Sequence, residues 1–283
     1  KVSSLSVLRP ETRFFMPELA EVAFACKAWK VGVGDTVDKV ETKSNSRVFR
    51  NVDPAKVKRS LREAILEGSE THGKKMLFRF SGNRWLGLHL GMTGWLFTEN
   101  SDYLVGKHDA LVLRQAERSL VFRDPRQFGR VNYQRGKDAS GWWSDLPPEV
   151  TSDAFTLELV RTVLKRRARS PVKAVLLMQE FFPGIGNWMV DEILWRARIH
   201  PAHPAGKLSP RKSKALWEET RFVASGALAT VGKCGGDPPD DWLFHVRWKD
   251  GGKCPVSGKS LVREEIAGRT TCLCPARQRL PRS

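Results

Sequence analysis

Apolar positions at helical spacing occur near the start of the chain. Between Glu18 and about Trp29 they recur every three or four residues, which predicts a helix with one buried stripe. A second helix is predicted from Pro54 to Gly68, because Asp53 suits an N-cap, proline suits the first helical position and glycine suits the end. Its apolar stripe consists of Val57, Leu61, Ala64 and Ile65. Two amphipathic helices are therefore expected in this region.

Between the two predicted helices, and again from about residue 70 to 135, the pattern changes to short apolar runs that are separated by Gly, Asn and Asp. The runs are MLFRF, RWLGLHL, GWLF, ALVLR, SLVF and RVNY. Short strands at this spacing, about six to eight in all, are typical of a β-sandwich. We therefore predict an α+β protein that begins with a two-layer β-sandwich and its flanking helices.

Helical periodicity returns after residue 151, where helices are predicted over 155–167, 172–180, 187–198 and 209–225. A Gly/Pro/Asp-rich stretch at 232–241 predicts a loop, and short β-like runs after it predict a terminal hairpin. The predicted domains are an N-terminal extension (1–15), a β-sandwich (16–136), a linker (137–151), a helical domain (152–241) and a hairpin (242–283). The extension is expected to be a leader or an upstream read-through outside the fold.

Charge points to a polyanionic partner. The 283 residues include 48 Lys and Arg against 31 Asp and Glu, a formal net charge of +17. Such an excess favours nucleic acid as the partner. The 41% apolar content argues against disorder, and the apolar runs are too short to cross a bilayer. Five cysteines are too few for a disulfide scaffold, so we expect a protein of a reducing, intracellular compartment.

A glycine-rich turn, Pro183-Gly184-Ile185-Gly186-Asn187, precedes one of the predicted helices. Backbone N–H groups at a helix N-terminus form a phosphate site, and Gly186 would contribute one of them. An ordinary tight turn explains the same residues equally well. The continuation with Asp191-Glu192 and Ile199-His200-Pro201 makes the pattern more specific.

Five further motifs occur in a fixed order along the chain. They are Met16-Pro17-Glu18-Leu19, His72-Gly73-Lys74-Lys75, His89-Leu90-Gly91-Met92-Thr93-Gly94, Lys107-His108-Asp109 and Asp124-Pro125-Arg126-Gln127-Phe128-Gly129. Together with the glycine turn, this set resembles the Fpg/Nei family of DNA glycosylases over nearly all of residues 16–279. The resemblance implies a helix-two-turn-helix in the helical domain and a finger in the terminal hairpin.

The resemblance assigns catalysis to Pro17, Glu18, Glu21 and Lys74. The secondary amine of an N-terminal proline can form an iminium ion with a sugar aldehyde, and an adjacent carboxyl can transfer the protons. Glu21 would support this site, and Lys74 would bind phosphate near the lesion. Without the resemblance, the two carboxylates are better explained as first-turn residues that satisfy a helix dipole, and Lys74 as a solvated lysine.

The resemblance also implies DNA contacts. The residues expected to bind the backbone are His89, Lys173, Gly186, Asn187 and Arg269. Base removal requires the nucleotide to leave the stack, which opens a gap in the duplex. Met92, Arg126 and Phe128 match the residues with which the family fills this gap, although a lone Met or Phe is more often a core residue. Lys74, Arg126, Lys173 and Arg269 are expected to line one DNA-binding cleft.

The terminal finger departs from the family pattern. The four positions that usually bind zinc are Cys254, Ser257, Cys274 and Arg277. A structural zinc needs four N or S donors, and a guanidinium would repel it. Cys272 is a poor substitute, because a C-x-C pair has unfavourable spacing. We therefore predict a finger without metal that is held by packing.

A second departure concerns the nucleophile. While residues precede Pro17, its nitrogen is a tertiary amide with no basic lone pair. Translation that starts at Met16 would allow removal of the methionine, and we expect Pro17 to become the N-terminus in this way.

The leading hypothesis is a bifunctional DNA glycosylase and AP lyase of base excision repair. It would act on double-stranded DNA with oxidised bases or abasic sites, through a proline Schiff base and β,δ-elimination, with no cofactor. The M-P-E-L start favours formamidopyrimidine and 8-oxoguanine substrates. The loop at 232–241 is the expected lesion cap. We expect a monomer with no membrane partner, in the bacterial cytoplasm or nucleoid or in the eukaryotic nucleus.

Two alternatives remain open. One is a non-catalytic binder of damaged DNA from the same family, with its proline blocked by the extension. The other is a general basic nucleic-acid protein, which would bind undamaged DNA in a salt-dependent way but would not explain the ordered gap-filling residues.

Overall fold

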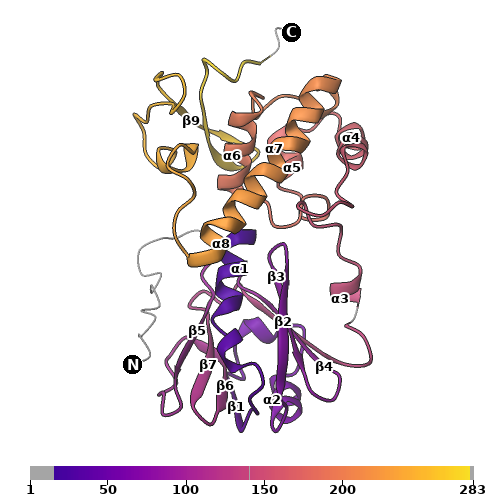
Figure 1. Cartoon of the computed structure of the whole chain (residues 1–283), viewed down its shortest axis with the longest axis vertical. Helices are drawn as coiled ribbons and strands as arrows, with labels where there is room; N and C mark the ends of the chain where they lie inside the picture. The colour runs from indigo at the N-terminus through magenta and orange to yellow at the C-terminus, as the bar shows by residue number, and fades with distance from the viewer. Residues whose placement is uncertain (1–15, 140, 281–283) are drawn as a thin grey trace. The chain divides into compact units, whose positions relative to one another are not determined.

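The computed structural model describes residues 16–139 and 141–280. The predicted extension, residues 1–15, and the last three residues of the predicted hairpin domain lie outside the described residues. The chain divides into two compact units. The first consists of Glu21–Leu146 together with Met16 and Pro17, and the second consists of Pro147 onward together with Glu18–Ala20 (Figure 1).

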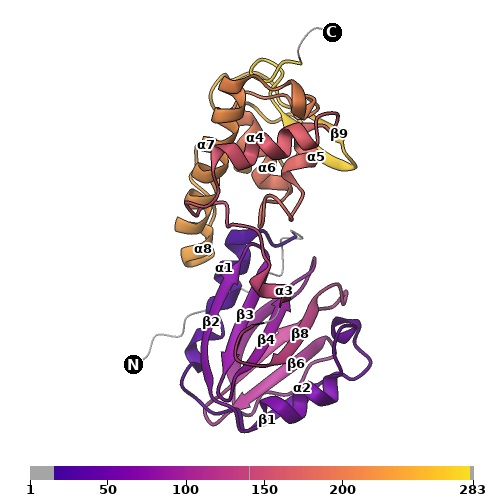
Figure 2. The same ribbon diagram turned by 90° about the vertical axis from the view of Figure 1, so that its right-hand side faces the viewer.

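The first unit is a sandwich of two four-stranded antiparallel sheets, which confirms the predicted fold class. One sheet has the order β1-β6-β7-β5, and the other, which faces the viewer in Figure 2, has the order β2-β3-β4-β8. The strands are β1 (Lys39–Thr42), β2 (Leu66–His72), β3 (Lys75–Phe80), β4 (Arg84–His89), β5 (Trp95–Asn100), β6 (Asp109–Gln115), β7 (Arg118–Arg123) and β8 (Arg130–Arg135). The six apolar runs of the sequence form β3 to β8. Strand β1 lies between the two helices, where strands were also predicted, whereas β2 begins at residues that were predicted to end the second helix.

Side chains from both sheets and from α1 (Leu19–Lys27) build the core of this unit. The predicted stripe of α1 is buried, with Val22 and Cys26 inside the cluster. Trp29 follows the helix, and its ring centroid lies 4.8 Å from that of Phe78 in β3. A short 3₁₀ turn, η1 (Lys30–Gly32), then leads towards β1. The buried aromatic rings thus connect the helix to the sheet.

The second predicted helix begins as expected but ends early. It is α2 (Pro54–Leu61), and the Asp53 carboxylate caps it by accepting the N–H of Ala55 at 2.9 Å. Of the predicted stripe beyond Leu61, Ala64 is buried but lies outside the helix, and Ile65 is 41% exposed and pairs with Thr36 in a β-bridge. The backbone of residues 63–66 bonds to residues 35–37 instead of continuing the helix. Gly68 lies in β2 at a bulge, not at a helix end.

The segment predicted as a linker contains a short helix, α3 (Gly141–Ser144). Trp142 of α3 packs on β4, where a Cβ on Gly87 would lie 2.4 Å from its ring. The Nζ of Lys75 in β3 also donates to the backbone oxygen of Trp142 at 3.0 Å. This part of the segment therefore lies against the sheet shown in Figure 2.

The second unit is helical and ends in a hairpin, as predicted. Its helices are α4 (Leu157–Arg166), α5 (Val172–Leu176), α6 (Asn187–Arg196), η3 (Ala205–Lys207), α7 (Pro210–Ala229), α8 (Val231–Cys234) and η4 (Leu243–His245). The hairpin pairs β9 (Val262–Ile266) with β10 (Arg269–Leu273) in antiparallel register. Helix α5 is shorter than the predicted 172–180 and α7 is longer than the predicted 209–225.

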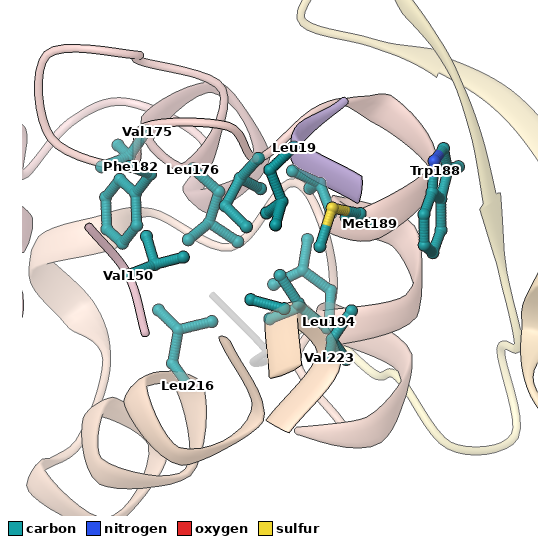
Figure 3. Packing of buried hydrophobic residues seen from close by; sticks show 14 of the residues in the cluster. Leu19, Val150, Val175, Leu176, Phe182, Trp188, Met189, Leu194, Leu216 and Val223 are labelled. Carbon is teal, nitrogen blue, oxygen red and sulfur yellow. The ribbon is translucent and has the colours of Figure 1, made fainter. Parts of the chain in front are cut away.

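One apolar cluster holds these helices together. Leu19 lies within it, among Leu176 of α5, Met189 of α6 and Val223 of α7 (Figure 3). The backbone N–H of Leu19 also donates to the oxygen of Gly184 at 3.0 Å. Segment 18–20 is therefore anchored next to the glycine-rich turn.

Helix α7 continues through Gly226, although glycine disfavours a helix interior. A Cβ at this position would lie 2.8 Å from the ring of Trp242, so the glycine allows the indole to approach the helix. Among the described residues, none of the helices is both long and apolar enough to span a membrane.

Candidate functional site

The Glu18 carboxylate binds the N-terminus of α6. The residue is 2% exposed. Its two oxygens accept backbone N–H groups of Gly186 at 2.8 Å, Trp188 at 3.0 Å and Met189 at 3.3 Å. Unpaired N–H groups and the helix dipole both favour a negative charge at this position. The arrangement fixes the orientation of both carboxylate oxygens.

Gly186 makes this contact possible because it has no side chain. A Cβ at Gly186 would lie 2.3 Å from the Glu18 carboxyl carbon. The glycine turn was predicted to offer the Gly186 N–H to a DNA phosphate. That prediction needs correction, since the N–H is buried and already bonded to Glu18. The absence of a side chain at Gly186 therefore leaves room for the Glu18 carboxylate.

The other predicted catalytic residues lie in the first unit. Pro17 is half-buried and directly precedes Glu18, and Glu21 is half-buried in the first turn of α1. Lys74 is half-buried in the turn between β2 and β3. Glu21 is thus a first-turn carboxylate, whereas Glu18 binds the end of a different helix.

Lys173 lies inside the second unit and not at its surface. Its side chain has no exposed area, and its Nζ donates to the Asp191 carboxylate at 2.7 Å and to the Thr270 oxygen at 3.3 Å. The other Asp191 oxygen accepts Arg247 at 2.6 Å and the N–H of Cys272 at 2.9 Å. Burial lowers the pKa of Lys173, and Asp191 opposes this shift. The predicted phosphate contact of Lys173 therefore needs correction: the ammonium is shielded from a ligand and holds β10 against α6.

Asn187 and Arg269 flank this buried network. The Asn187 amide donates to the Thr270 oxygen at 3.0 Å, and its second amide proton remains for another acceptor. Arg269 is exposed at the start of β10, after Ala267 and Gly268 with positive φ. The strand that carries Arg269 is thus fixed next to the N-terminus of α6.

The finger positions do not fit zinc. Trp195 donates its indole N–H to the Cys254 sulfur at 3.3 Å, and Ser257 Oγ lies 3.5 Å from the Cys274 sulfur. The Arg277 guanidinium lies 5.0 Å from the Trp195 ring centroid. Two thiols, one hydroxyl and one guanidinium make a poor donor set for this cation. The described part of the chain has no group of three or more His, Cys, Asp or Glu that could hold a metal.

Residues 124–129, which we call the wedge loop, carry two of the predicted gap-filling side chains. Phe128 is 40% exposed, and the guanidinium carbon of Arg126 lies 4.7 Å from its ring centroid. Asp124 holds the loop by accepting the N–H of Gly129 at 2.7 Å and the hydroxyl of Thr93 at 2.9 Å. Thr93 directly follows half-buried Met92, the third predicted residue.

A group of cations surrounds His89 at the end of β4. The ring Nδ1 accepts the N–H of Gly91 at 3.0 Å, so the neutral ring carries its proton on Nε2. Lys75 of β3 and Arg130 of β8 lie directly opposite His89 in the sheet. Burial lowers the pKa of His89 to about 4, and the positive charge of Lys74 contributes. At neutral pH, His89 is therefore an N–H donor without charge.

Lys75 and Arg130 were not predicted as neighbours of His89. Lys75 ends one recognised motif and Arg130 directly follows another, but strand pairing alone brings them together. The signal available in the sequence was that a basic residue directly precedes the run MLFRF and another begins the run RVNY. Without the order of the strands, that signal does not show which ends meet.

The low pKa of His89 predicts a loss of stability in acid. The unfolded chain binds a proton near the ordinary value of 6.5, whereas the folded chain binds it only near 4, so the free energy of unfolding falls as the pH drops through this window. The full loss is about 3 kcal/mol, at about 1.36 kcal/mol per pKa unit. Urea unfolding of the protein and of His89→Gln, between about pH 7.5 and 4.5, measures this loss. An equal pH dependence in His89→Gln would contradict the assignment, and His108→Gln, with an exposed ring, is the control.

The loop predicted at 232–241 begins too early, because residues 232–234 belong to α8; the segment after the helix has ordering contacts of its own. Gly235 ends the helix with a φ of 74°. The His245 ring nitrogen Nε2 lies 3.0 Å from the Pro238 oxygen, and the Trp242 N–H donates to the Pro239 oxygen at 3.0 Å. Its role as a lesion cap stays a prediction.

Comparison with known proteins agrees with this arrangement. The family model of the formamidopyrimidine-DNA glycosylase N-terminal domain matches residues 16–131, and that of the formamidopyrimidine-DNA glycosylase H2TH domain matches residues 146–235. Among curated relatives, formamidopyrimidine-DNA glycosylase of Roseiflexus sp. is 34% identical over 93% of this chain and 100% of its own. The Thermus thermophilus enzyme of the same name is 34% identical over 93% of this chain and 98% of its own.

Solved structures give the same result. Lactococcus lactis Fpg bound to DNA with an abasic site has a TM-score of 0.83 and 27% identity, and covers 93% of this chain and 99% of its own. The Lactococcus lactis complex with FAPY-dG DNA has a TM-score of 0.84 and 27% identity, over 93% of this chain and 100% of its own. The family suggested by the ordered motifs is thereby confirmed, and the chain belongs to the formamidopyrimidine-DNA glycosylase family of DNA-repair enzymes.

Proposed function

We propose that the protein is a bifunctional DNA glycosylase and AP lyase that removes oxidised bases from double-stranded DNA. Its relatives carry the glycosylase name, and related structures were solved with abasic-site, FAPY-dG and 8-oxo-G DNA. These names support formamidopyrimidine and 8-oxoguanine as the substrate class. The contacts of Glu18 are the observation that carries the proposal, because they place a buried, oriented carboxylate directly after Pro17.

The proposed reaction uses Pro17 as the nucleophile. Its amine nitrogen attacks C1′ of the damaged nucleotide, the C1′–N bond breaks, and the base leaves with a proton. Opening of the sugar ring gives an iminium ion. Loss of a C2′ proton breaks the C3′–O bond, a second elimination breaks the C5′–O bond, and hydrolysis of the imine frees the enzyme. Glu18 accepts and returns protons in these steps.

The surrounding residues have supporting roles in this proposal. Lys74 binds a phosphate near the lesion, and Glu21 supports the site from the next turn of α1. His89, Asn187 and Arg269 contact the DNA backbone. The planar fork of arginine suits phosphate oxygens, and the neutral His89 ring offers a single N–H.

Met92, Arg126 and Phe128 fill the gap that the damaged nucleotide leaves. Arg126 offers hydrogen bonds to the base left without a partner, and the exposed Phe128 ring and the Met92 chain take the place of the lost stacking. These contacts would offset part of the energy required to unstack the base, which is a few kcal/mol.

Trapping with borohydride tests the proposed chemistry, because reduction of the imine leaves a covalent protein–DNA adduct. A chain made to begin at Pro17 should form the adduct with an abasic-site duplex. The same chain with Pro17→Gly should form less, and a chain in which residues still precede Pro17 should form none. Equal trapping by the longer chain, with its N-terminus verified by intact mass, would exclude the proline mechanism.

A panel of duplexes with defined lesions and opposite bases measures the substrate class. Excision of formamidopyrimidine or 8-oxoguanine is expected, and excision of oxidised pyrimidines alone would contradict the proposed branch. Lesion-specific binding without any adduct would support the non-catalytic alternative.

A further inference from the structure

The wedge loop has a backbone conformation that needs support. Gln127 has a φ of 55°, which is uncommon for a residue other than glycine. Arg126 and Phe128 on either side of it are exposed, and their main mutual contact is the stacked guanidinium. Because few neighbours pack on these two side chains, the direction in which they point depends on the backbone.

One support comes from the loop after β4. Gly91 has a φ of 67°, and a Cβ there would lie 2.5 Å from both the carbonyl carbon of Phe128 and the nitrogen of Gly129. Asp124 accepts bonds from Thr93 and Gly129, as described above. The Gln127 N–H also donates to the Asp124 backbone oxygen at 3.3 Å. None of these contacts involves the carbonyl groups of Phe128 and Gly129.

A segment from a distant part of the sequence binds those carbonyl groups. It is the 3₁₀ turn η2 (Arg47–Phe49) with its C-cap residue Arg50. The Nη1 of Arg50 donates to the Gly129 oxygen at 2.9 Å, and its Nη2 donates to the Phe128 oxygen at 3.3 Å. Nη1 also donates to the Arg47 oxygen at 2.8 Å. One guanidinium thus connects the turn to two consecutive peptides of the wedge loop.

A second bond fixes the position of the turn itself. The Arg47 backbone N–H donates to the Oε1 of Gln127 at 2.8 Å. Gln127 is therefore held by its side chain, while Phe128 and Gly129 after it are held by their carbonyl groups. The planar guanidinium has several N–H donors and can make all the Arg50 contacts at once. The ammonium group of a lysine could not reach all of these carbonyl oxygens.

We propose that Arg50 is a positioning residue that sets the backbone of the wedge loop so that Arg126 and Phe128 are ready to enter the gap in the duplex. The inference rests on the proposed function, since the gap arises only when a nucleotide leaves the stack. Arg50 does not touch the reacting atoms in this role. It acts on the step in which the lesion is removed from the stack.

The test compares two steps that depend on the wedge loop, excision and unstacking, with trapping at a preformed abasic site, which depends on it less. Single-turnover excision of 8-oxoguanine from a duplex should fall about 10- to 100-fold in Arg50→Gln, the range expected when catalytic geometry shifts by about 1 Å. The fluorescence increase of a 2-aminopurine beside the lesion, which reports unstacking, should slow to the same extent. Trapping at a preformed abasic site should change less, and affinity for undamaged DNA should stay within about threefold.

Arg84→Gln is the matched control. Arg84 also donates a guanidinium N–H to a loop carbonyl, that of Ser81 at 2.7 Å, but it lies at the other end of β4. Wild-type excision and fluorescence by Arg50→Gln would overturn the inference, as would an equal loss in Arg84→Gln.

If Arg50→Gln does not fold, Arg50→Lys takes its place and should show an intermediate loss, while wild-type behaviour would overturn the inference. If the chain that begins at Pro17 and keeps Arg50 neither excises nor forms an adduct, the proposed function fails. The 2-aminopurine signal still tests Arg50 in that case, because it does not require bond cleavage.

Discussion

Glu18→Gln should reduce strand cleavage at an abasic site by about 10²- to 10⁴-fold, the range typical for loss of a general acid or base. Both carboxylate oxygens accept N–H groups from the start of α6. A glutamine would place an NH₂ group against at least one of these donors, so the variant loses both its proton acceptor and its orientation. Single-turnover cleavage by a chain that begins at Pro17 measures the effect. Glu158→Gln, which changes an exposed carboxylate in the first turn of α4, is the control.

Gly186→Ala gives an independent check of the same geometry. The new methyl group would meet the Glu18 carboxylate at about 2.3 Å, so the carboxylate must move although its chemistry is unchanged. Cleavage should fall as it does in Glu18→Gln. Normal cleavage by Gly186→Ala would show that the observed position of Glu18 is not the one that acts.

Asp191→Ala should lower the melting temperature of the second unit by about 6 to 20 °C. The substitution leaves the Lys173 ammonium and the Arg247 guanidinium buried without their shared carboxylate, and it removes the acceptor of the Cys272 N–H. Breaking a buried ion pair in this way costs about 3–5 kcal/mol, and each kcal/mol corresponds to about 2–4 °C for a unit of this size. Thermal unfolding followed by circular dichroism measures the shift.

Two further variants separate the buried charge from simple loss of a side chain. Asp191→Asn keeps one carbonyl acceptor and should fall between the wild type and alanine. Asp153→Asn removes an exposed carboxylate that lies 3.6 Å from Arg221 and should leave the melting temperature unchanged. A melting temperature for Asp191→Ala within about 2 °C of the wild type would show that the three donors find other partners.

The sequence was sufficient to predict an element where a local pattern is compatible with only one structure. Asp53-Pro54 predicted the start of α2, because an N-cap and a proline act within one turn. It was insufficient for the end of that helix, because Ala64 and Ile65 continue the helical spacing while their backbone bonds to residues 35–37. Whether these residues continue the helix or pair with residues 35–37 depends on contacts between distant segments, which a local sequence pattern does not show.

The same limit applies to the candidate site. The glycine turn and Glu18 were each recognised, but their contact joins residues 168 positions apart in the sequence. Lys173 was expected at the surface, since a lysine is seldom fully buried without a partner. Its partners are Asp191, one helix away, and the carbonyl of Thr270 on the hairpin. The residue types and motifs indicated which side chains to consider, but their binding partners depend on the three-dimensional fold.

The finger built around Trp195 changes how folding responds to the surroundings of the protein. A finger that folds around zinc depends on the free concentration of that ion, because ligand binding to the folded state adds to its stability by mass action. Here the corresponding contacts are an indole hydrogen bond, a stacked guanidinium and a small apolar cluster, all supplied by the chain. We therefore propose that the free energy of folding of this hairpin is not coupled to the supply of a metal ion.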